Sequence, residues 1–212
     1  ASNPFRPMDP LEALMTGQFN RIPYTSGTNT YEGALVVGAY APLGVTGADT
    51  LDIIKPHPNV GVYIHYGQPE VLTEVAKDFY NHPEGDSRLD LETPAINIIT
   101  DIVFTSYDQK SVELMSGHVR NVYNFHLTQK TENSVIGRAF NLSSDYTPMH
   151  GDDFTFLMLP KAGDSVDEEE RTTARAMVKY WANFAKYGTP SPVLGDTSAL
   201  PAWYPVDGEE KV

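Results

Sequence analysis

The chain contains no cysteine among its 212 residues. This absence excludes disulfides, zinc–thiolate sites and a cysteine nucleophile within the chain. The sequence also has no apolar run of about 18 residues or more, so no transmembrane helix is expected. The first residues, 1–4, carry neither the basic nor the apolar region of a secretory leader. No signal peptide is therefore expected in this sequence, although a processed chain would start in the same way.

Basic residues are scarce: 15 stand against 28 acidic residues, which gives a net charge of -13. A surface of this sign repels phosphate backbones, so nucleic acid is not an expected partner. Hydrophobic residues make up 41% of the chain, an ordinary share for a globular protein. The length is sufficient for one substantial domain.

Hydrophobic spacing predicts two short strands, over 22–28 and 121–128, and several helices. The helices are expected over 31–40, 69–81 and about 94–103, with the longest over 167–187. A stable open sheet usually has three or more strands. We therefore expect the chain to complete a sheet whose other strands are supplied elsewhere.

The longest predicted helix has acidic residues in its first turn, where the helix dipole favours negative charge. Gly188 is its expected C-cap, and Pro190 blocks its continuation. An apolar stripe follows helical spacing, and we interpret it as a core face. Its members are Met177, Tyr180, Trp181, Phe184 and Ala185.

A serine nucleophile of the usual hydrolase type is also missing. The pentapeptide Gly-x-Ser-x-Gly, which presents a reactive serine on a sharp strand-to-helix turn, does not occur. The nearest serines, Ser26 and Ser116, each precede a glycine but lack the first glycine of the pattern. If the chain takes part in acyl transfer, we expect the serine to be supplied from outside it.

An acid and a base for such a reaction are present. Glu32 follows a predicted strand and precedes a glycine, and His150 lies between a polar loop and a predicted helix start. A serine nucleophile needs a histidine to accept its proton and a buried carboxylate to orient that histidine and stabilise its charged form. Their order in the chain predicts the second and third members of a Ser–Glu–His site whose serine lies before residue 1.

Each of these residues also has a plain structural interpretation. Glu32 could be a surface carboxylate near a helix start. Of the other histidines, His65 and His126 are predicted to pack in strand-like or aromatic surroundings, and His118 to lie at a helix end. No two histidines have the i, i+4 spacing of a helical zinc site. Asp152 and Asp153 are interpreted as satisfying a helix N-terminus rather than as a second acid site.

Several segments, in order along the chain, resemble the C-terminal part of type-B carboxylesterases, the cholinesterase-like hydrolases. Residues 27–33 resemble the family's Gly-x-Asn-x-x-Glu-Gly segment, and 101–104 its helical Asp-x-x-Phe element. The strand at 123–127 is similar to the one before the family's histidine loop. The most specific matches are His150-Gly151-Asp152-Asp153 and the helix end at 180–190, Tyr-Trp-Ala-Asn-Phe-Ala-Lys-Tyr-Gly-Thr-Pro.

The resemblance implies an α/β fold. Residues 1–212 would be the C-terminal portion of one α/β-hydrolase domain, with its mostly parallel central sheet completed by a missing N-terminal part. Glu32 would be the triad acid and His150 the triad base, and the N-terminal part would supply the serine and the oxyanion hole. Substrates would be small apolar carboxylic esters. No metal or other cofactor is implied, and the protein would be secreted. Asn141-Leu142-Ser143 is a candidate N-glycosylation site.

A non-catalytic function on the same scaffold remains open. Neuroligin-like and neurotactin-like relatives of this family bind partners, and some have lost the serine while keeping the glutamate and histidine. Ser106 stands where cholinesterases carry a disulfide cysteine. This favours the carboxylesterase and juvenile-hormone-esterase branch.

Overall fold

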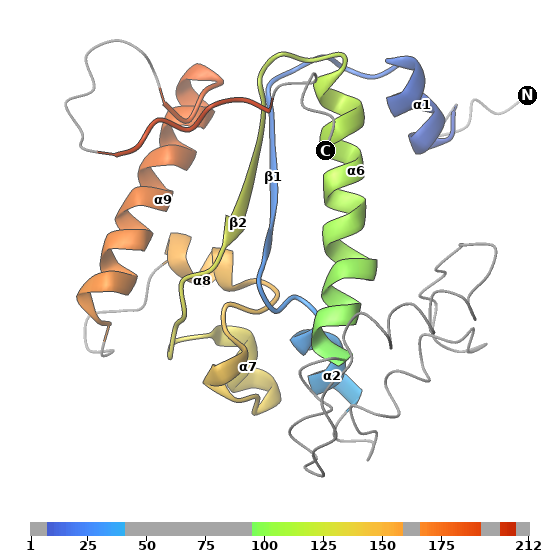
Figure 1. Cartoon of the computed structure of the whole chain (residues 1–212). Helices are drawn as coiled ribbons and strands as arrows, with labels where there is room; N and C mark the ends of the chain where they lie inside the picture. Colours follow the sequence, from blue (N-terminus) through green and yellow to red (C-terminus); the bar gives the residue numbers. More distant parts are fainter. Residues whose placement is uncertain (1–7, 41–94, 159–165, 192–199, 207–212) are drawn as a thin grey trace, which may run out of the picture. The chain divides into compact units, whose positions relative to one another are not determined.

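The computed structural model describes residues 8–40, 95–158, 166–191 and 200–206 (Figure 1). These residues divide between two compact units. Unit 1 comprises Ala1–Gly27, Asp108–Phe125 and Ala176–Val212, and unit 2 comprises Thr28–Tyr107 and His126–Arg175. In chain order the elements are α1 (Pro10–Thr16), β1 (Tyr24–Asn29), α2 (Ala34–Tyr40), the π-helix η2 (Thr100–Thr105), α6 (Ser106–Ser116), β2 (Val122–Leu127), α7 (Val135–Phe140), the 3₁₀ turn η3 (Ser144–Tyr146), α8 (Asp152–Met158) and α9 (Glu168–Tyr187).

The strands β1 and β2 lie side by side as a two-stranded sheet (Figure 1). The N–H of Tyr24 donates to the carbonyl of Asn121 at 2.9 Å, and the N–H of Thr30 donates to the carbonyl of Leu127 at 3.1 Å. The two members of each pair are separated by the same number of residues, so the strands run parallel and in constant register. Both predicted strands are confirmed. β1 begins two residues later than expected, after Pro23, which has no N–H to donate.

Unit 2 has a hydrophobic core of its own. Its buried members come from α2, from helical residues 95–99 and from the segment before His150: Ala34, Val37, Ala95, Ile96, Ile99 and Met149. Gly33 makes the closest backbone approach in this core, since a side-chain carbon there would collide with the carbonyl oxygen of Ile96. The glycine after Glu32 therefore lets helix 95–99 come directly against the turn that carries the glutamate.

The predicted helix over 94–103 forms, but its geometry changes at Thr100. Residues 95–99 are α-helical, η2 follows, and α6 continues the helix to Ser116. The hydroxyl of Thr100 donates to the carbonyl of Ile96 at 2.8 Å and accepts the N–H of Gly33 at 2.9 Å. The carbonyl of Ile96 would bind the N–H of Thr100 in a regular α-helix. A side chain that takes over this carbonyl gives a physical reason for the π-helical turn.

In unit 1 the stripe predicted on α9 is an aromatic packing face. Trp203 lies at the centre of this packing, with ring centroids 5.4 Å from Tyr180 and 5.8 Å from Trp181. The same indole contacts Tyr123 and Phe125 of β2 edge-on and donates its N–H to the carbonyl of Asn124. The stripe is narrower than predicted, because Ala185 is exposed. Apolar burial and oriented ring contacts together stabilise this unit.

The caps of α9 explain its boundaries. The carboxylate of Asp167 accepts the N–H of Glu170 at 2.7 Å, and the carboxylate of Glu170 accepts the N–H of Asp167 at 3.2 Å. This reciprocal pair is a capping box, so Asp167 precedes the helix instead of starting it. Gly188 has a φ of +69° and its N–H donates to Phe184, which confirms the predicted C-cap. The predicted helix over 69–81 lies outside the described residues.

Candidate active site

Glu32 lies in the turn that follows β1. Its carboxylate is 5% exposed, and one oxygen, Oε1, accepts the N–H of Asn29 at 2.7 Å. A buried carboxylate needs partners for its oxygens because burial without them is costly. The tight turn from Asn29 to Gly33 supplies the first partner from the backbone, and the burial rules out the alternative interpretation of Glu32 as a plain surface carboxylate.

His150 precedes Gly151 and α8, as its position in the sequence predicted. Gly151 has a φ of +84°, a left-handed conformation that glycine adopts without strain. The imidazole packs against Phe104 of η2, with ring centroids 5.1 Å apart. Its side chain is 46% exposed, so one side of the ring is held by the protein while the other can be reached from outside.

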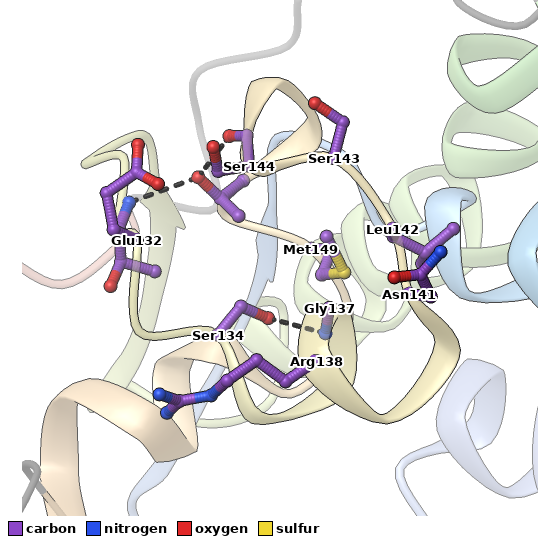
Figure 2. A pocket seen from close by; sticks show the side chains of 11 residues that line it. Glu132, Ser134, Gly137, Arg138, Asn141, Leu142, Ser143, Ser144 and Met149 are labelled. Atoms are coloured by element: carbon purple, nitrogen blue, oxygen red, sulfur yellow. Dashed lines mark hydrogen bonds between the residues drawn. The ribbon is translucent and has the colours of Figure 1, made fainter.

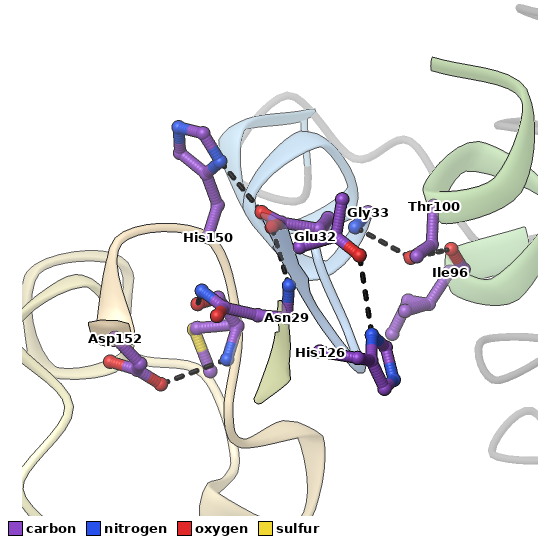
Figure 3. A network of polar contacts seen from close by, with 10 residues as sticks. Asn29, Glu32, Gly33, Ile96, Thr100, His126, His150 and Asp152 are labelled. Carbon is purple, nitrogen blue, oxygen red and sulfur yellow. Dashed lines mark hydrogen bonds and ion pairs between the residues drawn. The ribbon is translucent and has the colours of Figure 1, made fainter. Parts of the chain in front are cut away.

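The structure brings Glu32 and His150 together (Figure 3). The second carboxylate oxygen of Glu32, Oε2, lies 2.7 Å from Nδ1 of His150. The two residues are 118 positions apart in the chain and belong to the same unit. With a carboxylate at Nδ1, the proton of the neutral imidazole lies on Nδ1, and Nε2 is left as the proton acceptor. This is the tautomer that a general base for a hydroxyl nucleophile requires.

Backbone pairing joins the two segments that carry this pair. The N–H of Tyr31 donates to the carbonyl of Pro148 at 2.9 Å, and Tyr31 and Met149 form a parallel β-bridge. The chain after β1 therefore stops pairing with β2 at Leu127, and its next residue, Tyr31, pairs with the segment before His150. The acid and base segments meet beyond the carboxyl end of the β1–β2 pair, where open α/β sheets usually place their functional groups.

The site stabilises the protonated form of the His150 imidazole relative to a histidine in water. The pKa of His150 is raised above 6.5, mainly by its hydrogen bond to Glu32. Burial of the ring opposes this shift, and the negative charges of Glu32 and Asp153 add to it. A neutral His150 is needed to accept a proton, so the raised pKa sets the lower limit of the useful pH range.

We expect opposite pH dependences for activity and for stability. If His150 serves as a general base, it must be neutral, so any rate that depends on it should fall on the acid side with a midpoint above pH 6.5. Because the folded pKa lies above the unfolded one, the ion pair stabilises the fold below pH 6.5, and this contribution is lost as pH rises through the folded pKa. A pH–rate profile with thermal unfolding at matched pH tests both. An acid-side midpoint at or below 6.5 would contradict the assignment.

The predicted packing role of His126 is wrong. This side chain is exposed on β2, and its ring nitrogens lie 3.2 Å from the Thr28 hydroxyl and 3.4 Å from the Thr30 hydroxyl. Strand alternation turns it away from the buried Leu127. His118 lies just beyond the end of α6, as predicted, and contacts Phe19 edge-on. His57, His65 and His82 lie outside the described residues.

Asp152 and Asp153 begin α8, as expected for residues near a helix N-terminus. Asp152 is fully buried, and its carboxylate accepts the N–H of Met149 at 2.8 Å. Further hydrogen bonds come from the hydroxyls of Ser134 and Thr155. Burial raises the pKa of this carboxyl, while these three hydrogen bonds act in the opposite direction. Asp152 thus lies at the helix start as expected, but its carboxylate binds the N–H of Met149 and two hydroxyls, and no helix N–H of the described residues is among these partners.

A cavity of about 220 Å³, lined mostly by polar residues, includes part of the segment before His150 in its lining (Figure 2). Its lining includes Thr147 and Met149 from this segment, together with Ser134, Arg138 and Asn141. Asn141 ends α7 in a left-handed conformation with a φ of 54° and is exposed. An exposed asparagine at a turn is accessible to modification, and glycosylation at this position stays a prediction.

Within residues 8–40, 95–158, 166–191 and 200–206, no three histidine, aspartate or glutamate side chains gather as metal ligands. In the same part of the chain, no helix has the length and apolar character needed to cross a bilayer.

Comparison with known protein families matches residues 2–212 to the carboxylesterase family. The chain belongs to this family. Similar proteins include pyrethroid hydrolase Ces2e of Rattus norvegicus, which is 22% identical over 213 residues covering 98% of this chain and 35% of that protein. Juvenile hormone esterase of Tribolium castaneum is 26% identical over 90% of this chain and 34% of its own length. Liver carboxylesterase of Sus scrofa is 28% identical over 96% of this chain and 34% of its own length.

Membership of the carboxylesterase family implies the α/β-hydrolase fold. The parallel β1–β2 pair with its surrounding helices agrees with that fold. The chain spans about a third of the length of the curated relatives it matches. The resemblance to a C-terminal part of a type-B carboxylesterase is confirmed.

Proposed function

We propose that this chain supplies the acid and the base of a serine carboxylesterase. The observation that carries the proposal is the 2.7 Å contact between Nδ1 of His150 and a buried carboxylate oxygen of Glu32. His150 accepts the proton of a serine hydroxyl at Nε2 and later returns it to the leaving alcohol. Glu32 holds the ring in this tautomer and stabilises the imidazolium while it carries the extra proton.

The serine and the oxyanion donors come, in this proposal, from an N-terminal part of the same hydrolase domain. Two features of the described residues support a partner of this kind. A two-stranded sheet is marginally stable by itself. Phe154 and Met158, one turn apart on α8, are 58% and 66% exposed, so an apolar stripe is left open beside the base. The N-terminal part would add strands and cover apolar surface.

The substrate class follows from the mechanism and from the family. A serine nucleophile with a neutral histidine base attacks carboxylic esters and needs neither a metal nor an organic cofactor. Small apolar esters are the proposed substrates. Secretion is proposed from the resemblance to secreted esterases, and a glycosidase-sensitive shift in mass would establish whether Asn141 carries a glycan.

We expect residues 1–212 to be aggregated or molten when expressed by themselves, because the apolar surface that faces the absent strands is uncovered. Co-expression with the N-terminal part should give a monodisperse esterase. A fluorophosphonate, which labels activated serines, should then label the N-terminal part and leave residues 1–212 unlabelled. The measurements are size-exclusion chromatography, thermal unfolding and mass spectrometry of the labelled peptides.

Two results would contradict this proposal. One is a cooperative unfolding transition from a monodisperse 212-residue monomer. The other is a fluorophosphonate label on a serine of this chain, such as Ser26 or Ser116. A well-folded assembly that binds no fluorophosphonate would favour the alternative function, a cholinesterase-like binding or adhesion protein without catalysis.

A further inference from the structure

Two buried polar side chains bind the backbone of Met149, one at its carbonyl oxygen and the other at its N–H. The carbonyl oxygen of Met149 accepts a hydrogen bond from Nδ2 of Asn29 at 2.8 Å. The N–H of Met149 donates to Oδ2 of Asp152 at 2.8 Å. We call these two contacts the Met149 clamp. Met149 is fully buried, Asp152 is fully buried and Asn29 is 2% exposed, so both hydrogen bonds are shielded from water.

Asn29 acts on the acid as well as on the base. Its backbone N–H donates to Oε1 of Glu32, while its side chain holds the residue before His150 (Figure 3). One residue thus contacts both the segment of the acid and the segment of the base, and it adds to the backbone pairing of Tyr31 with Pro148 and Met149. No described residue donates to Oδ1 of Asn29. An amide that is buried with one half unpaired costs free energy, so its stabilising contribution rests on the contact with Met149.

Asp152 anchors the other side of His150. Its carboxylate closes the turn from Met149 to Asp152, in which the N–H of Asp152 also returns to the carbonyl of Met149 at 3.0 Å. Ser134, which lines the polar cavity, and Thr155 of α8 donate to the same carboxylate. The turn that presents His150 is therefore tied to α7 and α8 through a single buried side chain.

We infer that Asn29 and Asp152 are positioning residues that hold His150 within reach of Glu32 by clamping the Met149 peptide between them. This inference rests on the proposed function of the Glu32–His150 pair. It goes beyond that function because neither residue touches the imidazole or a reacting atom. A displacement of about 1 Å in a group that performs chemistry can cost about a hundredfold in rate.

The test uses Asn29→Ala and Asp152→Asn in the assembled enzyme. The first removes the donor to Met149 and keeps the backbone N–H that holds Glu32. The second keeps the shape of the side chain but replaces one of its two acceptor oxygens by an NH₂ group and removes the charge, which weakens the set of bonds from Met149, Ser134 and Thr155. We expect kcat to fall about 10²-fold in each variant, with KM changed much less.

A second readout follows His150 directly. Titration of the imidazole by NMR should show its pKa moving down towards 6.5 in both variants, because the hydrogen bond to Glu32 is the main cause of the raised value. The charged groups that face His150 are Glu32 and Asp153. Asp153→Asn is therefore the charge control: it removes a neighbouring carboxylate without touching the Met149 clamp, and its loss of kcat should be far smaller.

Asn124→Ala is the matched stability control. Asn124 donates to the carbonyl of Ser26 at 3.2 Å and to Asp108 at 2.6 Å, so its loss breaks comparable hydrogen bonds in β2. It should lower the melting temperature and leave the pKa of His150 unchanged.

The inference is overturned if the Asn29 and Asp152 variants fold with unchanged kcat and an unchanged His150 pKa. It is also overturned if both fail to fold while the Asn124 variant folds, since the clamp would then serve folding. An assembly without esterase activity would refute the proposed function separately, because the NMR titration still reports on the clamp.

Discussion

Replacement of His150 by alanine should abolish ester turnover in the assembled enzyme. Removal of the base from a serine triad costs a factor on the order of 10⁴–10⁶ in kcat. The fold should survive, because the imidazole is half exposed and its loss leaves the Met149 clamp and the Tyr31–Pro148 pairing in place. Steady-state hydrolysis of a simple ester and thermal unfolding measure the two effects.

His126→Ala is the control for this experiment. His126 lies in the same unit and also contacts polar groups next to the acid segment, but its partners are the hydroxyls of Thr28 and Thr30. We expect it to keep most of its turnover. Near-normal hydrolysis by His150→Ala would show that the base lies elsewhere.

Glu32→Gln should lower turnover by a factor on the order of 10²–10⁴, with substrate affinity changed much less. Both oxygens of Glu32 accept hydrogen bonds, one from the N–H of Asn29 and one from Nδ1 of His150. A glutamine has one acceptor oxygen, so either rotamer turns its NH₂ group towards one of these donors. The charge that stabilises the imidazolium is lost as well.

Glu32→Asp is the comparison variant that separates the loss of the charge from the loss of the side chain's shape. The charge remains, although the carboxylate is withdrawn by one methylene group, so the loss of turnover should be milder than in the glutamine variant. Equal damage from both would indicate a packing role. No damage from either would move the acid elsewhere, with Asp153 the first candidate, because the carboxylate of Asp152 is already bonded to Met149, Ser134 and Thr155.

The parts of the fold that could be predicted are those with local causes. α9 could be predicted from the helical spacing of its apolar residues, the acidic residues in its first turn and Gly188 at its end. The same kind of signal marks α1, where Asp9 accepts the N–H of Leu11 and Pro10 begins the helix, but it was not used. α7 and α8, with six and seven residues, are too short to form without tertiary packing. The start of α8 was predicted from Asp152 and Asp153, whereas no local pattern predicted α7.

Some residues of the candidate site could likewise be predicted from local sequence, and others could not. Motif resemblance identified Glu32 and His150, but spacing gives no information on whether residues 118 positions apart touch. The proposed roles of Asn29 and Asp152 were not predicted, because Asn29 appeared only as part of a family motif and Asp152 was explained locally as a helix-start residue. The decisive contact of Asn29 is to a peptide 120 positions away. The π-helical turn at Thr100 depends likewise on a bond from Gly33, across 67 positions.

The contacts that bring Glu32 and His150 together do not include the proposed nucleophilic serine. Asn29, the Tyr31–Pro148 pairing and the Met149 peptide all belong to unit 2, and the same groups complete its buried core. Selection for a folded protein therefore preserves the framework that brings the two segments together, although not the imidazole itself, whose loss the fold should survive. A descendant that exchanged its serine for another residue would still inherit this framework as an evolutionary vestige. In our proposal, an acid and a base held in this way therefore do not by themselves distinguish an active esterase from a non-catalytic relative, and the residue at the nucleophile position does.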